Sequence, residues 1–390
     1  MNIMDKEKMY HLQVYKRYPV VFVKGKGIKL YDTNNKEYLD FLAGISVVNA
    51  GHCNEKIVEA IKKQAEELIH VSNLFYTIPQ VELAERLVNL SGLNKVFFCN
   101  SGAESNEAAI KFIRKWGKQH NKDKIVSFYN SFHGRTYGAL SATPKDKFRE
   151  GFEPFLEGFE YLPYNDEEKI KELDNKVAGI ILELVQGEGG VIPAKEEFIK
   201  TLKDVCEDKN ILLVVDEVQT GVGRTGTFFA YEQYNITPNI VTLAKALGNG
   251  VPIGAVILDD EVSKYIKYGD HGTTFGGNPL VCAASLATID IILELIKNKK
   301  VIEKGNYFID KLKKFDYEFI RDVRGKGLMV GIELEFNAND IVNKMLKKGF
   351  VINATSDKVL RFLPPLIVEK EHIDLMVDNL KDVFEEIKND

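Results

Sequence analysis

A lysine between two apolar runs is the first residue of this chain whose setting suggests chemistry. The runs 240–244 and 253–258 have the length and composition of buried strands, and Lys245 directly follows the first of them. Burial of an ammonium group is costly; it lowers the pKa of the amine and makes it a nucleophile toward carbonyl groups. A lysine in this place can also extend its side chain to water. The stretch alone leaves both interpretations open.

An acidic residue ends another apolar run. Asp216 follows the strand-like residues 211–215 and precedes Glu217, Val218 and Gln219. A carboxylate buried at the end of a strand needs a positive partner, and a protonated pyridine nitrogen would be one. The alternative is an acid that caps the next turn.

Two further segments that follow predicted strands could bind the phosphate and the ring of a ligand. Ser101, Gly102 and Ala103 precede a predicted helix, whose N-terminus presents free N–H groups and attracts anions. The competing interpretation is a capping box formed by Ser101 and Glu104. Phe132 offers a flat face to a flat ring, or it is a packed aromatic residue of a surface loop.

Carboxylate-binding groups are also present. Arg135 lies in the loop that contains Phe-His-Gly-Arg, and Arg361 lies in an apolar strand. Glu188 stands in a Gly-Glu-Gly-Gly run that leaves its side chain room to move. Thr273 and Thr274 precede a helix and could contact a phosphate or a carboxylate, or cap the helix. Arg135 and Glu188 also fit solvated surface residues.

Several classes of protein and site are excluded by composition. The net charge of −5 and the pI of about 5.9 leave no basic footprint for nucleic acid. The histidines and cysteines show no metal-ligand spacing, so we expect no metal site. The four separated cysteines fit free thiols of a cytoplasmic protein. We find no signal core and no apolar run long enough to cross a bilayer.

One motif is rejected. Residues 221–226 match GxGxxG and follow a strand, but the residues after them are aromatic and not helix-like. The next acid, Glu232, comes too soon to bind a ribose, so we do not expect dinucleotide binding.

Together, the remaining groups form a recognisable set. They comprise a carbonyl-reactive lysine, an acid for a ring nitrogen, an aromatic face, a phosphate cradle and two carboxylate forks. This combination predicts pyridoxal 5'-phosphate as the cofactor and amino acids as the substrates.

The elements that must position these groups alternate between strand and helix from residue 95. We predict strands at 95–99, 124–129, 177–184 and 211–216, and helices at 104–120 and 196–209. The strands lack polar alternation, so both faces of their sheet should be covered. The prediction is an α/β fold with a mainly parallel sheet, whose carboxyl-end edge binds the ligand.

A smaller unit should be built from both ends of the chain. We predict N-terminal strands at 20–23, 28–31 and 38–41, helices at 55–69, 81–90 and 279–297, and C-terminal strands at 328–334, 350–354 and 359–362 with helices at 340–348 and 370–388. The expected domains are 1–58 and 306–390 for the small unit and 59–305 for the large unit.

The whole chain resembles the class III (fold-type I) pyridoxal-phosphate aminotransferases. The resemblance rests on the ordered strings NSGAESNEAAIK, FHGRT, VQGEGGV, DEVQTGVGRTG, LAKALGNGVPIGA, HGTTFGGNPL, VRGKGLMVGIEL and LRFLPPL. HGTTFGGNPL and FHGRT lean toward the acetylornithine aminotransferase branch over enzymes that use ornithine or 4-aminobutyrate. Two departures, Leu184 after Glu183 and Asn54-Glu55 after Gly-His-Cys, touch no residue assigned to chemistry.

The resemblance implies a role for each candidate residue. Lys245 looks like the lysine that bonds to the cofactor aldehyde, and Asp216 like the partner of the pyridine nitrogen. The cofactor site would contain Ser101, Gly102, Ala103, Phe132, Asp216, Glu217, Val218, Gln219, Lys245 and Thr274, the last reaching the partner subunit's phosphate. Arg135 would bind the carboxylate far from the reacting amine, Arg361 the carboxylate beside it, and Thr273 the substrate. Glu188 would pair with Arg361 and release it when glutamate binds.

The resemblance also implies a fold, an assembly and a reaction. We expect a seven-stranded sheet in the large domain, a small α/β domain and a homodimer with its active sites at the subunit interface. The expected substrates are N2-acetyl-L-ornithine and 2-oxoglutarate, with glutamate as a product. Alternatives are transaminases for ornithine, succinylornithine, succinyl-diaminopimelate or 4-aminobutyrate, an aminomutase or racemase of the same fold, and a non-catalytic binding protein.

Overall fold

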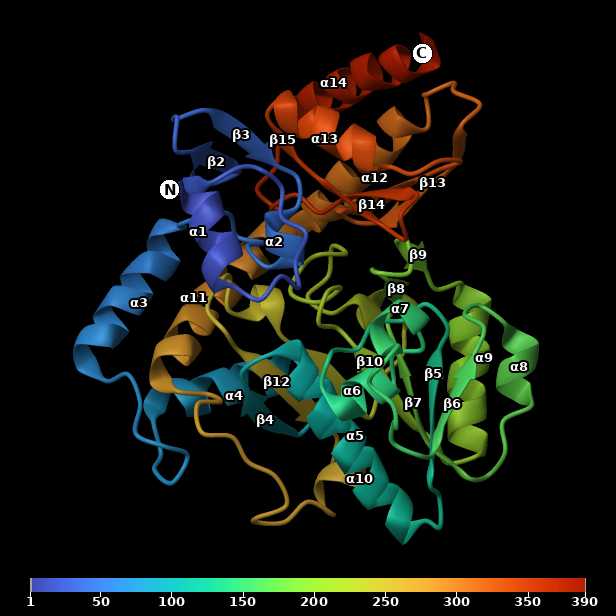
Figure 1. Cartoon of the computed structure of the whole chain (residues 1–390). Coiled ribbons are helices and arrows are strands. Elements are labelled where there is room, and N and C mark those ends of the chain that lie inside the picture. Colours follow the sequence, from blue (N-terminus) through green and yellow to red (C-terminus); the bar gives the residue numbers. More distant parts are fainter. Residues whose placement is uncertain (1, 390) are drawn as a thin grey trace.

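A seven-stranded sheet forms the centre of the protein, for which the computed structural model describes residues 2–389 (Figure 1). Its strands lie in the order β4 (Lys95–Cys99), β12 (Gly254–Leu258), β11 (Ile240–Leu243), β10 (Leu212–Asp216), β7 (Val177–Leu182), β5 (Lys124–Phe128) and β6 (Phe159–Leu162). Within this sheet β12 is antiparallel to both neighbours, and the other strands share one direction. The predicted mainly parallel sheet is confirmed.

Successive residues of the central strands pack into different cores. Leu212 and Val214 of β10 pack with α5 (Gly102–Gln119) on one face. Leu213 and Val215 join the larger core on the other face. Both faces are therefore apolar, which explains why the strand sequences show no polar alternation.

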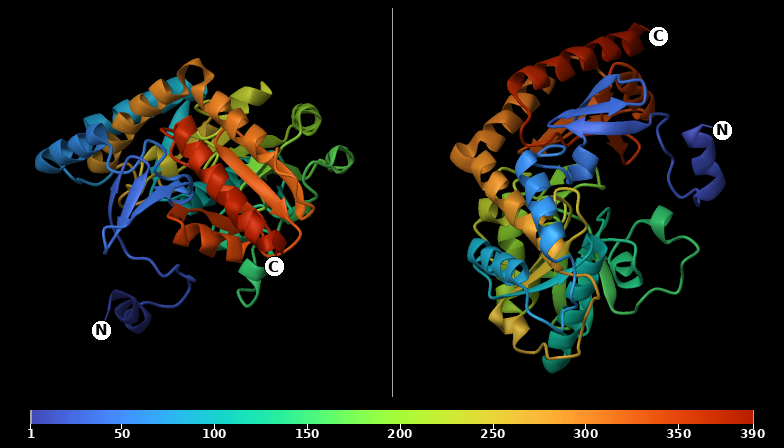
Figure 2. Two further views of the ribbon diagram at one scale, coloured as in Figure 1. Left: turned by 90° about the horizontal axis from the view of Figure 1, so that it is seen from above. Right: turned by 90° about the vertical axis from the view of Figure 1, so that its left-hand side faces the viewer.

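Helices cover the sheet and connect it to the smaller unit. The helices beside the sheet are α4 (Ile78–Ser91), α5, α8 (Glu167–Lys171), α9 (Glu196–Asp208), α10 (Asp260–Ser263) and α11 (Pro279–Ile296) (Figure 1). Shorter elements are α1 (Ile3–Tyr10), α2 (Ala43–Ser46), α6 (Tyr137–Ser141), α7 (Asp146–Arg149) and the β8–β9 pair (Val185–Gln186, Ile192–Pro193). In both views of Figure 2, α1 stands away from the body of the molecule, and it buries no residue.

The two ends of the chain meet in the smaller unit. The N-terminal strands β1 (Phe22–Lys26), β2 (Lys29–Asp32) and β3 (Glu37–Asp40) continue into β15 (Phe350–Val351), which pairs in parallel with β3. A second sheet has the order β13 (Ile320–Lys326), β14 (Met329–Leu334), β17 (Val359–Phe362) and β16 (Asn353–Thr355), with α12 (Lys300–Leu312), α13 (Asn339–Lys347) and α14 (Lys370–Asn389) beside these strands. The expected boundaries after residues 58 and 305 fall inside α3 (Glu55–Glu67) and α12, and they stay a prediction.

Two sequence-based expectations need correction. The strand expected at 350–354 is divided at Ile352, because β15 pairs with β3 while β16 pairs with β17 in the other sheet. The expectation that no apolar run could cross a bilayer is wrong by length and composition, because the helical run Pro279–Leu312 contains an 18-residue stretch with a mean hydropathy of 2.0. Its α11 part is apolar because it packs against α3 and α4 and buries residues such as Val281 and Ile289.

Candidate active site

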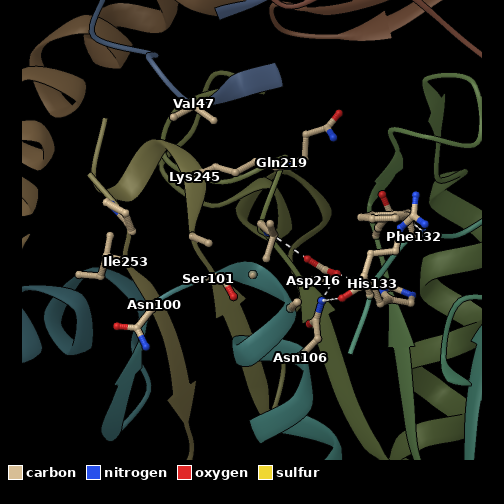
Figure 3. A pocket seen from close by; sticks show the side chains of 18 of the residues that line it. Val47, Asn100, Ser101, Asn106, Phe132, His133, Asp216, Gln219, Lys245 and Ile253 are labelled. Carbon is tan, nitrogen blue, oxygen red and sulfur yellow. Dashed lines mark hydrogen bonds and ion pairs between the residues drawn. The ribbon is translucent and has the colours of Figure 1, made fainter. Parts of the chain in front are cut away.

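A cavity of about 350 Å³ lies at the carboxyl-end edge of the large sheet (Figure 3). It receives residues that follow β4, β5, β7, β10 and β11, which end at this edge because they run in one direction. Its lining residues are Val47, Asn100, Ser101, Gly102, Ala103, Asn106, Phe132, His133, Gly134, Arg135, Glu183, Glu188, Asp216, Val218, Gln219, Ala244, Lys245, Gly250, Val251, Pro252 and Ile253. The volume lies within the usual range for small-molecule sites.

Lys245 occupies the position predicted for it, directly after β11 and on the cavity. Its backbone has a φ of 44°, in the left-handed region that a lysine rarely adopts. The ammonium group has no hydrogen-bond partner among residues 2–389. Burial lowers the pKa of Lys245, and the nearby Glu188 carboxylate partly opposes this effect. The missing hydrogen-bond partner and the lowered pKa both suit an amine that reacts with a carbonyl group.

Asp216 ends β10 at the cavity and is held by several donors. Its Oδ2 atom accepts a 2.7 Å hydrogen bond from Asn106 Nδ2 and lies 2.7 Å from His133 Nδ1. Its Oδ1 atom accepts from the backbone N–H of Val218 at 3.0 Å. Burial lowers the pKa of His133, but the hydrogen bond and charge of Asp216 outweigh burial and raise it above its ordinary value. Asp216 therefore has a fixed orientation at the cavity (Figure 3).

The N-terminus of α5 supplies the predicted anion site. Ser101 Oγ accepts from the Glu104 backbone N–H at 3.2 Å, which is one of the two bonds of the competing capping box, but the Glu104 carboxylate accepts from the Asn100 N–H instead. Nevertheless, no residue described in the structure accepts from the N–H groups of Gly102 and Ala103, which line the cavity. A Cβ on Gly102 would lie 2.6 Å from Val218 Cγ1. The Ser101 cap therefore leaves these two N–H groups available to an anion.

Phe132 and Arg135 lie together at the edge of the cavity. The ring of Phe132 packs edge-on against Phe148, with the centroids 5.6 Å apart. The Arg135 guanidinium lies 3.8 Å from the centroid of the same Phe148 ring and is exposed. Arg135 is thus placed where a carboxylate that enters from solvent would meet it first.

Arg361 and Glu188 form the ion pair that the sequence suggested. Nη1 of Arg361 lies 2.6 Å from Oε1 of Glu188, and the Arg361 side chain is 1% exposed. Burial raises the pKa of Glu188, but the Arg361 charge and hydrogen bond outweigh burial and lower it below its ordinary value. The arginine also approaches Gln219 Oε1 at 3.5 Å. The guanidinium is therefore already satisfied by protein groups.

Four predicted residues do not line the cavity: Glu217, Thr273, Thr274 and Arg361, the last of which bonds to the lining residue Glu188. Glu217 faces away from it and accepts hydrogen bonds from Thr220 Oγ1 at 2.6 Å and from the Tyr231 N–H at 3.0 Å. Thr273 Oγ1 accepts a 2.9 Å hydrogen bond from Asn100, a lining residue. Thr274 is exposed, and its contact with a partner subunit stays a prediction.

The sequence analysis gave no role to several lining residues, among them His133, Asn106 and Glu183. His133 and Asn106 hold Asp216, and both stand inside the strings that carried the resemblance. Glu183 accepts from the backbone N–H groups of Phe132 at 2.9 Å and Gly187 at 3.1 Å. Burial raises the pKa of Glu183 to about 7. Its position just after β7 was the available signal, because other site residues also follow strands.

The donor set fits pyridoxal 5'-phosphate. A free amine, a fixed carboxylate and two unpaired backbone N–H groups surround one cavity, and the buried His133 Nε2 has no partner among residues 2–389. Lys245 would hold the aldehyde carbon, Asp216 the ring nitrogen and the α5 N-terminus the phosphate.

Comparison with known proteins agrees with this chemistry. The profile of the family "Aminotransferase class-III" matches residues 11–384. An acetylornithine aminotransferase from Methanocaldococcus jannaschii is 61% identical over 99% of both chains, and one from Aquifex aeolicus is 52% identical over 96% of this chain and 100% of its own.

Solved structures extend the comparison to three dimensions. The ornithine aminotransferase of Toxoplasma gondii superposes with a TM-score of 0.94 at 34% identity, covering 99% of this chain and 95% of its own. The acetylornithine aminotransferase of Elizabethkingia anophelis gives 0.87 at 32% identity, covering 98% of both chains. The chain belongs to the class III aminotransferases, enzymes that use pyridoxal 5'-phosphate.

Proposed function

We propose that this enzyme transfers the terminal amine of N2-acetyl-L-ornithine to 2-oxoglutarate. The products would be N-acetyl-L-glutamate 5-semialdehyde and L-glutamate, in the biosynthesis of arginine. The observation that carries the transaminase proposal is an unpaired Lys245 amine on a cavity that also contains the anchored Asp216. The choice of donor is supported by the 61% identity to the M. jannaschii acetylornithine aminotransferase.

Asp216 and Lys245 would have different roles in the reaction. When bound, pyridoxal 5'-phosphate supplies a ring that accepts the electron pair of the breaking C–H bond. Asp216, fixed by Asn106 and His133, would keep the ring nitrogen protonated. The lowered pKa of Lys245, caused mainly by burial, lets its Nζ atom take a proton from the donor carbon and return it during the reaction.

Two different substrates must use one site. Acetylornithine has no carboxylate beside its reacting carbon, whereas glutamate has one. During the first half-reaction the Glu188–Arg361 pair, with its 2.6 Å contact, would keep Arg361 neutralised. When glutamate binds, its carboxylate would replace Glu188 on Arg361. Arg135, exposed at the edge of the cavity, would bind the distal carboxylate of both substrates.

Assembly as a homodimer is part of the proposal. Large apolar side chains are exposed beside the predicted partner-contacting residue Thr274 and from the segment before α4 into the first turn of this helix; they include Leu74, Phe75, Tyr76, Ile78, Val81, Tyr268 and Phe275. A second copy of the chain would remove these side chains from water. A sedimentation experiment that finds only monomer would contradict this part.

We also place the enzyme in the cytoplasm, consistent with the absence of a disulfide among its four cysteines.

Ornithine is the second candidate donor, because the T. gondii structure with a TM-score of 0.94 is an ornithine aminotransferase. The deciding experiment compares kcat/KM for acetylornithine, ornithine and 4-aminobutyrate, each with 2-oxoglutarate, by following glutamate formation. We expect acetylornithine to have the highest value. A higher value for either other donor would reject the proposed substrate.

A further inference from the structure

The backbone carbonyl of Glu188 receives hydrogen bonds from two parts of the chain. Lys145 Nζ donates to it at 2.8 Å, Thr355 Oγ1 at 3.0 Å and Ser356 Oγ at 3.1 Å. Lys145 lies just before α7, beside the large sheet, whereas Thr355 ends β16 and Ser356 follows it in the smaller unit. A carbonyl oxygen has two lone pairs, so three donors, one of them charged, saturate it.

The rest of this loop is held as firmly. Arg324 of β13 donates to the carbonyls of Gly190 at 2.7 Å and Val191 at 3.1 Å, and the Gly187 N–H donates to Glu183 at 3.1 Å. The glycines allow close packing here. A Cβ on Gly187 would lie 2.3 Å from Gln219 Oε1. The backbone of residues 187–191 is therefore tightly held.

The Glu188 side chain has more freedom than its backbone. The Glu188 side chain is 26% exposed, while the Arg361 side chain to which it bonds is 1% exposed. We propose that Lys145, Thr355 and Ser356 clamp the Glu188 carbonyl, so that the Glu188–Arg361 pair opens by rotation of the glutamate side chain alone. Lys145 is then a positioning residue that sets how readily Arg361 becomes available. This inference rests on the exchange of substrate carboxylates at Arg361 proposed above.

The clamp predicts which of the two substrates is favoured when Lys145 is replaced. Loss of the Lys145 ammonium would let the Glu188 backbone change position and would weaken the ion pair between the Glu188 carboxylate and Arg361. Arg361 would then be free more often, which favours glutamate over acetylornithine. Lys147 provides a matched control, because it is an exposed lysine of the same segment that contacts the Phe148 ring and makes no hydrogen bond to Glu188.

The test uses the full-length enzyme with Lys145→Met, Thr355→Val, Lys145→Arg and the control Lys147→Met. Single-turnover rates are measured separately for acetylornithine and glutamate with the cofactor bound. Hydrogen–deuterium exchange of residues 186–192 is measured with and without cofactor, because it reports the clamp independently of turnover. Thr355→Val is included because it removes a hydroxyl from the same carbonyl without removing a charge.

We expect Lys145→Met and Thr355→Val to raise the glutamate-to-acetylornithine rate ratio about three- to tenfold and to accelerate exchange at residues 186–192 about fivefold or more. Lys145→Arg and Lys147→Met should stay within about twofold of the wild type. Equal rate changes in both half-reactions, or unchanged exchange in both Lys145→Met and Thr355→Val, would overturn the clamp. A wild-type enzyme that does not react with acetylornithine would instead reject the proposed donor, while the exchange result would still decide the clamp.

Discussion

The side-chain amide of Asn106 donates a 2.7 Å hydrogen bond to Oδ2 of Asp216. Its orientation is fixed, because Asn106 Oδ1 accepts a 2.9 Å hydrogen bond from Thr242 Oγ1. Thr242 belongs to β11, the strand that leads to Lys245. One buried amide on α5 therefore connects the strand that carries the reactive lysine to the carboxylate at the end of β10.

This connection predicts the effect of Asp216→Asn. An amide at this position would be neutral, and it could no longer accept from both Asn106 and His133 through one charged oxygen. We expect kcat to fall by about 10²- to 10³-fold, because an electrostatic partner of the transition state is lost. Steady-state kinetics test this, and circular dichroism should show an unchanged fold. Activity within about twofold of the wild type would contradict the role of Asp216.

Glu183 predicts a pH dependence of stability. Burial raises its pKa from 4.5 to about 7, so the folded state holds this proton more tightly than the unfolded state does. The resulting stabilisation is fully present below pH 4.5 and is lost as pH rises through about 7. This contribution to the free energy of unfolding is on the order of 3 kcal/mol. Glu183→Gln removes the titration, although it also loses one of two accepting oxygens.

The difference in the free energy of unfolding between the wild type and Glu183→Gln should therefore be smaller at pH 8 than at pH 5. Urea unfolding at both pH values measures the gap. Glu150→Gln serves as the control, because it makes the same change of residue type at an exposed position. A Glu183→Gln gap that is constant or widens with pH would show that Glu183 is ionised in the folded protein at pH 5.

Arg361 and Glu188 should affect the two half-reactions differently. Arg361→Gln should lower kcat/KM for glutamate about a hundredfold, because a buried charge partner of the substrate carboxylate is removed. The acetylornithine half-reaction should change much less. Glu188→Gln weakens the 2.6 Å pair from the other side and should raise the glutamate rate relative to the acetylornithine rate. Equal changes in both single-turnover rates for Glu188→Gln would exclude the exchange at Arg361.

The phosphate cradle predicts a size limit at Gly102. A Cβ there would lie 2.6 Å from Val218 Cγ1, so Gly102→Ala must displace a side chain that lines the cavity. We expect the affinity for pyridoxal 5'-phosphate to fall about tenfold or more. Fluorescence titration of the cofactor-free protein measures this. The double variant Gly102→Ala/Val218→Ala should recover most of the affinity, and a double variant as weak as the single one would exclude the clash as the cause.

The buried strands of the large sheet could be predicted well from the sequence, because short apolar runs without alternation are typical of strands that are covered on both faces. It did not predict α12, which contains Gly305 at its centre; a Cβ there would lie 2.1 Å from the Gly327 carbonyl oxygen. β13 was also missed, because Ile320–Lys326 is largely charged and polar. Close packing and charged edge strands leave little periodic signal in a sequence.

The site was predictable where single residues follow strands, as for Lys245 and Asp216. The residues that hold those side chains were not, because Asn106 and Glu183 act through contacts between segments that are distant in sequence. Glu217 is the opposite case, a residue that was predicted to belong to the site but does not line the cavity. It adjoins Asp216 in sequence, yet its side chain bonds to Thr220 and Tyr231 and stays away from the cavity. Sequence order does not indicate which way a side chain points after a strand ends.

We expect Lys245 to bond covalently to the cofactor beside Asp216. The most direct measurement loads the purified enzyme with pyridoxal 5'-phosphate, reduces it with borohydride and identifies the modified peptide by mass spectrometry. We predict a phosphopyridoxyl group on Lys245 and none at this site in Lys245→Ala. A label on a different lysine, or an unlabelled and fully active enzyme, would contradict it.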